Sequence, residues 1–233
     1  VIVVTGAGRG VCSGADSAVG AESCDTVDGK GAHLFGKNAD KTARQAGGFV
    51  EAIFKCRKPS IAAINGAAVG VGATLALPMD IRIAAETARF GFVFARRGLV
   101  PEAGSAWFLP RIVGLSKAMQ WCLSGRLLSA PEALEAGLVS EVMAPDALLT
   151  RAEEIAREIA DETSAISIAL TRQMLWRYSG APDPFELLKI DGPLSVELGG
   201  TADVREGVSA FIEKRKPKFP GRVSKDMPSR SPF

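Results

Sequence analysis

Residues 58–74 read K-P-S-I-A-A-I-N-G-A-A-V-G-V-G-A-T, an apolar run followed by an Asn-Gly turn and two further glycines. The pattern predicts a short strand over residues 60–64 and, after the glycines, a short helix over residues 73–77 that Pro78 limits. A backbone with so little side-chain bulk at a strand end allows a ligand to approach closely. The N-terminus of the following helix adds unsatisfied amide groups and a partial positive charge.

A second segment of the same kind lies near the start of the chain. The run V-I-V-V over residues 1–4 predicts a buried strand, T-G-A-G-R-G over residues 5–10 a glycine-rich turn, and C-S-G-A-D follows over residues 12–16. Two amides converging on one oxygen, one from each segment, would form an oxyanion hole. The two segments together are therefore the candidate site.

The remaining chain changes from a mixed to a helical pattern. Further strands are expected over residues 80–85, 89–94 and 138–143, and helices over residues 40–55, 105–111, 116–123 and 130–136. From about Asp146 onward the pattern is helical, over residues 148–163, 166–178 and 204–215. Residues 18–41 predict a long loop or a weakly held helix, and residues from about 216 a loose basic tail.

The composition narrows the class of function. A chain of 233 residues with 47% hydrophobic content can bury a substantial core, and its net charge of +2 gives no electrostatic case for a nucleic acid or an anionic membrane as partner. The apolar runs are too short to span a bilayer and the start shows no leader pattern, so a cytoplasmic protein is expected. Four scattered cysteines and one histidine, His33, lack the spacing of a metal site, and none is expected.

The opening residues also invite a dinucleotide-binding interpretation, because a strand that leads into a glycine turn can hold a pyrophosphate. The G-x-G-x-x-G pattern would need glycine at Val11, and the pattern of short-chain dehydrogenases would need it at Cys12. Those enzymes also use a tyrosine with a lysine four residues later, whereas the one tyrosine, Tyr178, is followed at that spacing by Pro182. We therefore reject this interpretation.

Five sequence motifs, in a fixed order and spacing, indicate a different family. Besides residues 5–16 and 58–74, they are D-I-R-I-A-A-E-T-A-R-F-G-F (80–92), G-L-V-P-E-A-G-S-A-W-F-L-P-R-I-V-G (98–114) and L-S-A-P-E-A-L-E-A-G-L-V-S-E-V (128–142), and R-E-G-V-S-A-F-I-E-K-R-K-P-K-F (205–219) continues them. In order and spacing the sequence resembles the enoyl-CoA hydratase/isomerase (crotonase) family. The resemblance runs from Val1 to about Arg222, apart from residues 17–41.

The resemblance implies an α/β fold, a crotonase-like (ClpP/crotonase) spiral of ββα units over residues 1–145. A helical C-terminal oligomerisation region with a basic tail would follow over residues 146–233, and the assembly would be a homotrimer or hexamer. Members of the family carry several tens of residues before the strand at Val1, so the N-terminal part of the family domain is expected to be absent from this chain.

The resemblance also implies a site for an acyl-CoA thioester. The peptide N–H groups of Ala15 and Val71 would form the oxyanion hole for the thioester carbonyl. The CoA thioester channel and oxyanion region would be lined by Cys12, Ser13, Gly14, Ala15, Asp16, Gly70 and Gly72. No cofactor is expected, because coenzyme A is part of the substrate.

The family register also bears on the reaction. Hydratases of the family activate water with two glutamates whose positions fall on Thr74 and Phe94, and neither of these residues can act as a carboxylate base. Glu102 matches the acidic residue of the isomerase branches, where a single carboxylate suffices to move a proton from C2 to C4 of a 3-enoyl-CoA. The resemblance therefore favours a Δ3-Δ2-enoyl-CoA isomerase of fatty-acid or related acyl-CoA metabolism. The alternatives are an enoyl-CoA hydratase or other crotonase-type lyase or hydrolase, and a non-catalytic acyl-CoA-binding protein.

Overall fold

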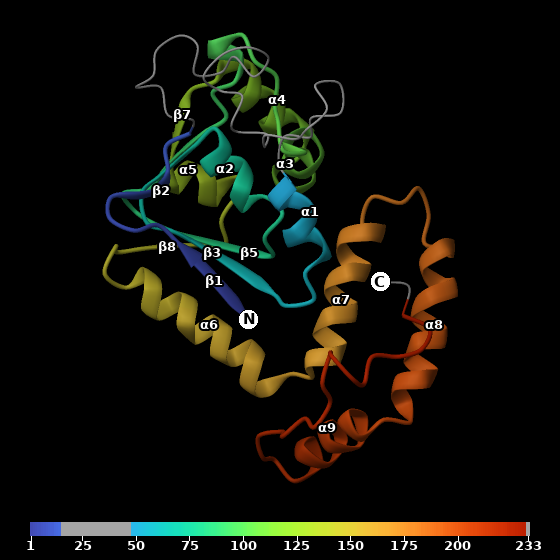
Figure 1. Ribbon diagram of the computed structural model, residues 1–233. Coiled ribbons are helices and arrows are strands. Elements are labelled where there is room, and N and C mark those ends of the chain that lie inside the picture. The colour runs from blue at the N-terminus through green and yellow to red at the C-terminus, as the bar shows by residue number, and fades with distance from the viewer. Residues whose placement is uncertain (15–47, 232–233) are drawn as a thin grey trace, which may run out of the picture. The chain divides into compact units, whose positions relative to one another are not determined.

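The structure is a computed structural model that describes residues 1–14 and 48–231 (Figure 1). The expected residues Ala15 and Asp16, His33, and most of the helix expected over residues 40–55 lie outside the described residues. The chain forms two compact units. One comprises Val1–Val3, Phe54–Ile61 and Leu149–Phe233, and the other comprises Val4–Ile53 and Ala62–Leu148.

The strands of the chain alternate between two four-stranded sheets. The first sheet has the order β1 (Ile2–Thr5), β3 (Ser60–Ile64), β5 (Ile81–Ala85) and β8 (Glu141–Met143). The second has the order β2 (Gly10–Cys12), β4 (Ala67–Val69), β6 (Arg89–Gly91) and β7 (Leu127–Ser129). Each of the first three strand pairs thus contributes one strand to each sheet before a helix follows, which is the spiral of ββα units expected from the sequence.

Parallel pairing aligns the strand ends that carry the candidate site. In β4 and β6, Ala67 lies opposite Arg89 and Val69 opposite Gly91, and β5 and β8 are also parallel. The last strand of the second sheet, β7, runs antiparallel to β6. All five residues of β3 are buried. This agrees with its unbroken apolar sequence, because a parallel strand is covered on both faces.

Helices follow the strands of the two sheets. They are α1 (Gly48–Lys55), α2 (Val71–Ala76), the 3-10 turn η4 (Ala95–Arg97), α3 (Ser105–Val113), α4 (Leu115–Ser124) and α5 (Ala130–Glu135). Helix α5 contacts β6 and β7 of one sheet and β8 of the other, and it lies between them (Figure 1). The strand expected over residues 89–94 is too long, because β6 ends at Gly91 and Phe94 already leads into η4.

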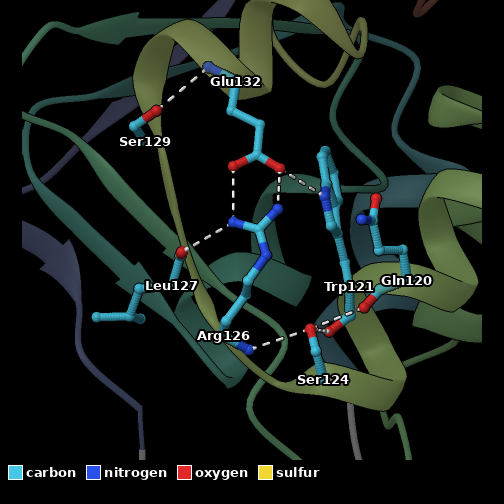
Figure 2. Close-up of polar contacts among 7 residues, drawn as sticks. All are labelled: Gln120, Trp121, Ser124, Arg126, Leu127, Ser129 and Glu132. Atoms are coloured by element: carbon cyan, nitrogen blue, oxygen red, sulfur yellow. Dashed lines mark hydrogen bonds and ion pairs between the residues drawn. The ribbon is translucent and has the colours of Figure 1, made fainter.

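A polar network fixes the turn from α4 through β7 to α5, residues 124–132, which we call the Arg126–Glu132 corner (Figure 2). The Arg126 guanidinium holds the Glu132 carboxylate with two donors, and the buried Trp121 Nε1 donates to the same carboxylate at 3.0 Å. The Trp121 ring in turn stacks on Phe92, just after β6, with ring centroids 6.2 Å apart. The corner therefore anchors the edge of the second sheet.

The other unit consists mainly of four helices: α6 (Leu148–Glu162), α7 (Ala165–Tyr178), α8 (Phe185–Gly199) and α9 (Ala202–Ile212). Ser164 and Thr201 cap α7 and α9 by accepting hydrogen bonds from backbone amides three residues later. A small core joins α7 and α8 through Ile166, Leu170 and Leu194. Among the described residues, no helix combines the length and the apolarity that a membrane crossing needs.

The expectation of a loose C-terminal tail is wrong for most of its length. The Gly221 amide donates to Asp203 at 2.8 Å, and the Ser229 amide donates to Glu197 at 2.7 Å. Arg215 of the basic run pairs with Glu206 and Glu213. Backbone amides and acidic helix residues hold the tail on its own unit, and a composition-based expectation of disorder does not detect such contacts.

Candidate active site

The site begins where β2 meets β4 and α2, at a spacing that only glycine allows. A Cβ atom at Gly72 would lie 2.1 Å from the carbonyl oxygen of Cys12, and one at Gly66 would lie 2.0 Å from the carbonyl oxygen of Arg9. Real Cβ atoms do not approach backbone atoms so closely. The glycines of the two sequence segments therefore bring two stretches of main chain into direct contact.

The turn between β4 and α2 is fixed by Gly70. Its φ of 58° is left-handed, and its amide donates to the carbonyl of Gly91 in β6 at 2.9 Å. A Cβ atom at Gly70 would lie 3.6 Å from Cα of Gly14, which shows that the two predicted segments meet. Of the residues expected in the CoA channel, Cys12, Gly14, Gly70 and Gly72 are thus brought together, with the exposed Ser13 beside them. Ala15 and Asp16 lie outside the described residues.

The first turn of α2 presents backbone donors at this junction. The amides of Ala73 and Thr74 both donate to the carbonyl of Gly70 at 3.0 Å. Val71 and Gly72 come first in the helix, where no preceding helical carbonyl can accept from their amides. Val71 is only half-buried, and its place at the start of the helix makes its N–H a candidate donor for a ligand oxygen.

Arg82 stabilises the opposite end of the same helix. Its guanidinium donates to the carbonyls of Leu77 and Met79 after the last turn of α2, and its Nε donates to Leu138 at 2.8 Å. Burial lowers the pKa of Arg82 to about 10, which still leaves it charged at neutral pH. A cation at the helix C-terminus complements the helix dipole and fixes the position of the helix that carries Val71.

Glu102 stands on a strained turn immediately before α3. Ala103 has a φ of 52°, an uncommon value for a residue with a Cβ atom, and Gly104 follows with a φ of 70°. The backbone amide and the hydroxyl of Ser105 both donate to the Glu102 carbonyl, at 2.9 and 2.7 Å. Such backbone strain persists where the surrounding structure over-determines it, often at functional sites. The turn determines the direction of the Glu102 side chain.

The Glu102 carboxylate reaches α2 through Thr74. The Thr74 hydroxyl lies 2.7 Å from Oε1 of Glu102, and its second neighbour is the carbonyl oxygen of Val71 at 3.3 Å. Glu102 and Val71, both expected from the family resemblance but 31 positions apart in the sequence, are thus linked through Thr74 at one helical turn. Thr74 itself was not predicted to take part, because its contact with Glu102 spans 28 residues and no local pattern signals it.

The two positions of the family's water-activating glutamates are buried and uncharged. Thr74 is fully buried, and the Phe94 side chain is 6% exposed. In the described part of the chain no group of three or more His, Cys, Asp or Glu side chains is arranged to hold a metal ion. The acid–base group that the predicted site residues bring to the first turn of α2 is the Glu102 carboxylate.

Comparisons with known proteins identify this architecture. Residues 1–222 match the family described as enoyl-CoA hydratase/isomerase. An enoyl-CoA hydratase of Alternaria alternata is 43% identical over 220 residues, which are 94% of this chain and 70% of that protein. The 1,2-epoxyphenylacetyl-CoA isomerase of Escherichia coli is 37% identical over 95% of this chain and 81% of its own.

A solved structure agrees with the sequence relatives. The chain superposes on an enoyl-CoA hydratase subunit from Geobacillus kaustophilus with a TM-score of 0.79 and 30% identity, over 95% of this chain and 80% of that one. The expected crotonase fold is thereby confirmed, and the chain belongs to the enoyl-CoA hydratase/isomerase family.

Proposed function

We propose that the protein is a single-carboxylate enoyl-CoA isomerase that converts a 3-enoyl-CoA into the conjugated 2-enoyl-CoA. One observation carries the proposal. Through Thr74, the Glu102 carboxylate is hydrogen-bonded to the same helical turn that presents the Val71 amide. A base hydrogen-bonded to the turn that carries the oxyanion donor would face the C2 atom of a thioester whose carbonyl oxygen accepts from that donor.

The reaction needs only these groups. The Glu102 carboxylate takes a proton from C2, and the electron pair of that C–H bond delocalises over the C3–C4 double bond and the thioester carbonyl. The Val71 amide, together with the Ala15 amide expected from the family register, donates to the resulting dienolate oxygen. The protonated Glu102 then returns its proton at C4, and the double bond comes to lie between C2 and C3. General acid–base catalysis of this kind contributes typically about 10²–10⁴ in rate.

The residues at the other two acid positions favour isomerisation over hydration. Addition of water by the paired-glutamate route needs carboxylates where this chain has Thr74 and the buried Phe94. The phenyl ring of Phe94 offers no acceptor with which to orient a water molecule. The relative from Escherichia coli, a 1,2-epoxyphenylacetyl-CoA isomerase, is an example of a family member named for an isomerisation.

Replacement of Glu102 by Gln tests the proposal, because the amide keeps the shape of the side chain but cannot accept a proton as a base. With a 3-enoyl-CoA substrate we expect kcat to fall by roughly 10²–10⁴ with an unchanged thermal midpoint. Glu135→Gln, at an exposed site on α5, is the matched control and should keep the full rate. An unchanged rate of Glu102→Gln would overturn the assignment.

Hydration is the second candidate, because the Alternaria alternata relative and several others are named as hydratases. Incubation of the protein with 2-enoyl-CoA, followed by mass analysis, distinguishes the reactions, since hydration adds one water and isomerisation adds nothing. A water adduct formed faster than the double bond moves would favour the hydratase. Tight binding of both thioesters without turnover would favour a non-catalytic acyl-CoA-binding protein.

A further inference from the structure

We infer that Thr74 is a positioning residue that holds Oε1 of Glu102 and leaves Oε2 to exchange the proton with the substrate. The inference rests on the proposed function, since it assigns separate tasks to the two oxygens of the proposed base. It also gives a task to the position that carries a carboxylate in the family's hydratases.

The direction of the hydrogen bond follows from counting protons. A threonine hydroxyl has one hydrogen, and Thr74 has two acceptors in reach, Oε1 of Glu102 at 2.7 Å and the carbonyl oxygen of Val71 at 3.3 Å. A hydrogen bond to an ionised carboxylate is shorter and stronger than one to a neutral carbonyl. The Thr74 hydroxyl therefore donates to Glu102 while that carboxylate is the base.

The donor is fixed in place by its surroundings. Thr74 is fully buried, and its amide is hydrogen-bonded to Gly70, whose own amide is bonded to Gly91 of β6. A β-branched side chain on a helix is also restricted about χ1. The hydroxyl thus has little rotational freedom, and its hydrogen bond restricts the Glu102 carboxylate in the same way.

The consequence is an asymmetric carboxylate. Within residues 1–14 and 48–231, Oε1 has the Thr74 hydroxyl as donor, and Oε2 has no protein partner. A proton taken from the substrate therefore goes to Oε2, which leaves the bond between Thr74 and Oε1 intact. Because Thr74 also lies three residues after Val71, one helical turn sets the spacing between the proton-carrying oxygen and the oxyanion donor.

The test is removal of the hydroxyl in a nearly isosteric side chain. Thr74→Val should lower kcat by roughly 10- to 100-fold, in line with the loss of a hydrogen bond to a charged group, while the Kd for a saturated acyl-CoA stays within about twofold of wild type. Thr74→Ser, which keeps the hydroxyl, should recover most of kcat. Thr163→Val, directly after α6, removes a hydroxyl that donates to the carbonyl of Ile159 at 2.6 Å and should leave kcat unchanged.

The outcomes separate this inference from the proposed function. Full activity of Thr74→Val beside an inactive Glu102→Gln would overturn the positioning role and leave the isomerase proposal standing. Full activity of Glu102→Gln would overturn both. A Thr74→Ser variant as slow as Thr74→Val would show that packing, and not the hydroxyl, matters. Should Thr74→Val not fold, Thr74→Ala provides the same comparison with Thr74→Ser.

Discussion

Glu102 and Glu132 lie in the same unit and have opposite surroundings. Glu132 in the Arg126–Glu132 corner accepts two hydrogen bonds from a guanidinium and one from an indole (Figure 2). Glu102 accepts one hydrogen bond from a neutral hydroxyl, and in the described part of the chain no cation forms an ion pair with it. One carboxylate is fully occupied, and the other keeps an oxygen available.

This difference distinguishes Glu132, which has a structural role, from Glu102, the proposed catalytic base. The hydrogen bonds from Arg126 hold the pKa of Glu132 below its usual range against the opposing effect of burial, and the Trp121 N–H adds to the lowering. A carboxylate that is stabilised in its ionised form by a cation is a poor proton carrier, because its basicity falls. A carboxylate held by a single neutral hydroxyl has a fixed direction and one oxygen left to accept a proton.

The largest expected effect comes from a substitution of Gly72, which lies on the same helical turn as Thr74. At Gly72, near Glu102, an added Cβ atom would lie 2.1 Å from a backbone oxygen that cannot move alone, whereas at Gly125, in the corner, it would meet the flexible Arg96 side chain at 2.9 Å. Gly72→Ala should therefore displace α2 from β2 and lower kcat/KM by at least roughly 100-fold, or prevent folding. Steady-state kinetics and the yield of folded protein measure this.

Gly125→Ala is the matched variant. It keeps the left-handed φ of 57° and should therefore lose some stability, but retain kcat/KM within a few-fold. If the two variants were equally active, the close approach of α2 to Cys12 would not be needed for the site. If Gly125→Ala were the more damaging, the corner would matter more to function than the site itself.

A smaller effect is expected when Glu132 is changed to Gln. The amide cannot accept both Arg126 donors and the Trp121 N–H as a charged carboxylate does, so the thermal midpoint should fall by about 2–4 °C. Because the Glu132 carboxylate is hydrogen-bonded to Arg126 and Trp121 and not to Thr74, kcat should stay within about twofold. Glu102→Gln should show the reverse pattern, and calorimetry beside kinetics on both variants makes the comparison. Equal losses of kcat in the two variants would contradict the assignment of a catalytic role to Glu102 and a structural role to Glu132.

Much of the fold could be read from the sequence, and the missed strands share a physical cause. The apolar run of β3 and the long helices α6 and α7 have enough residues for a recognisable sequence pattern, and they were predicted within a few positions. The strands β2, β4 and β7 have three residues each, too few for any period, and, unlike the equally short β6 and β8, they do not lie within one of the longer strands expected from the sequence. They were missed for that reason.

The residues of the candidate site also differ in whether a local sequence pattern could predict them. Gly70 and Gly72 were identified because close backbone approach demands glycine, a requirement that is local and visible. Glu102 was found through the register of a family motif, not through its surroundings. Thr74 was seen only as a missing acid, because a hydroxyl that bonds a carboxylate 28 residues away leaves no trace in either segment.

The smallest effect should appear in the acid stability of the corner. The folded-state pKa of Glu132 lies below its unfolded value of about 4.3, so the unfolded chain binds a proton first as the pH falls. The contribution of Glu132 is therefore complete above roughly pH 5 and disappears as the pH falls through the folded-state pKa. The gap in thermal midpoint between wild type and Glu132→Gln should be constant above about pH 5 and shrink steadily below about pH 4. Glu206, whose pKa is about 2 because Arg215 and the Lys218 amide bind it, titrates in both proteins and cancels from the gap. A gap that persisted undiminished at about pH 2 would mean that the charge of Glu132 does not stabilise the corner, and the contrast with Glu102 would then rest on shape alone.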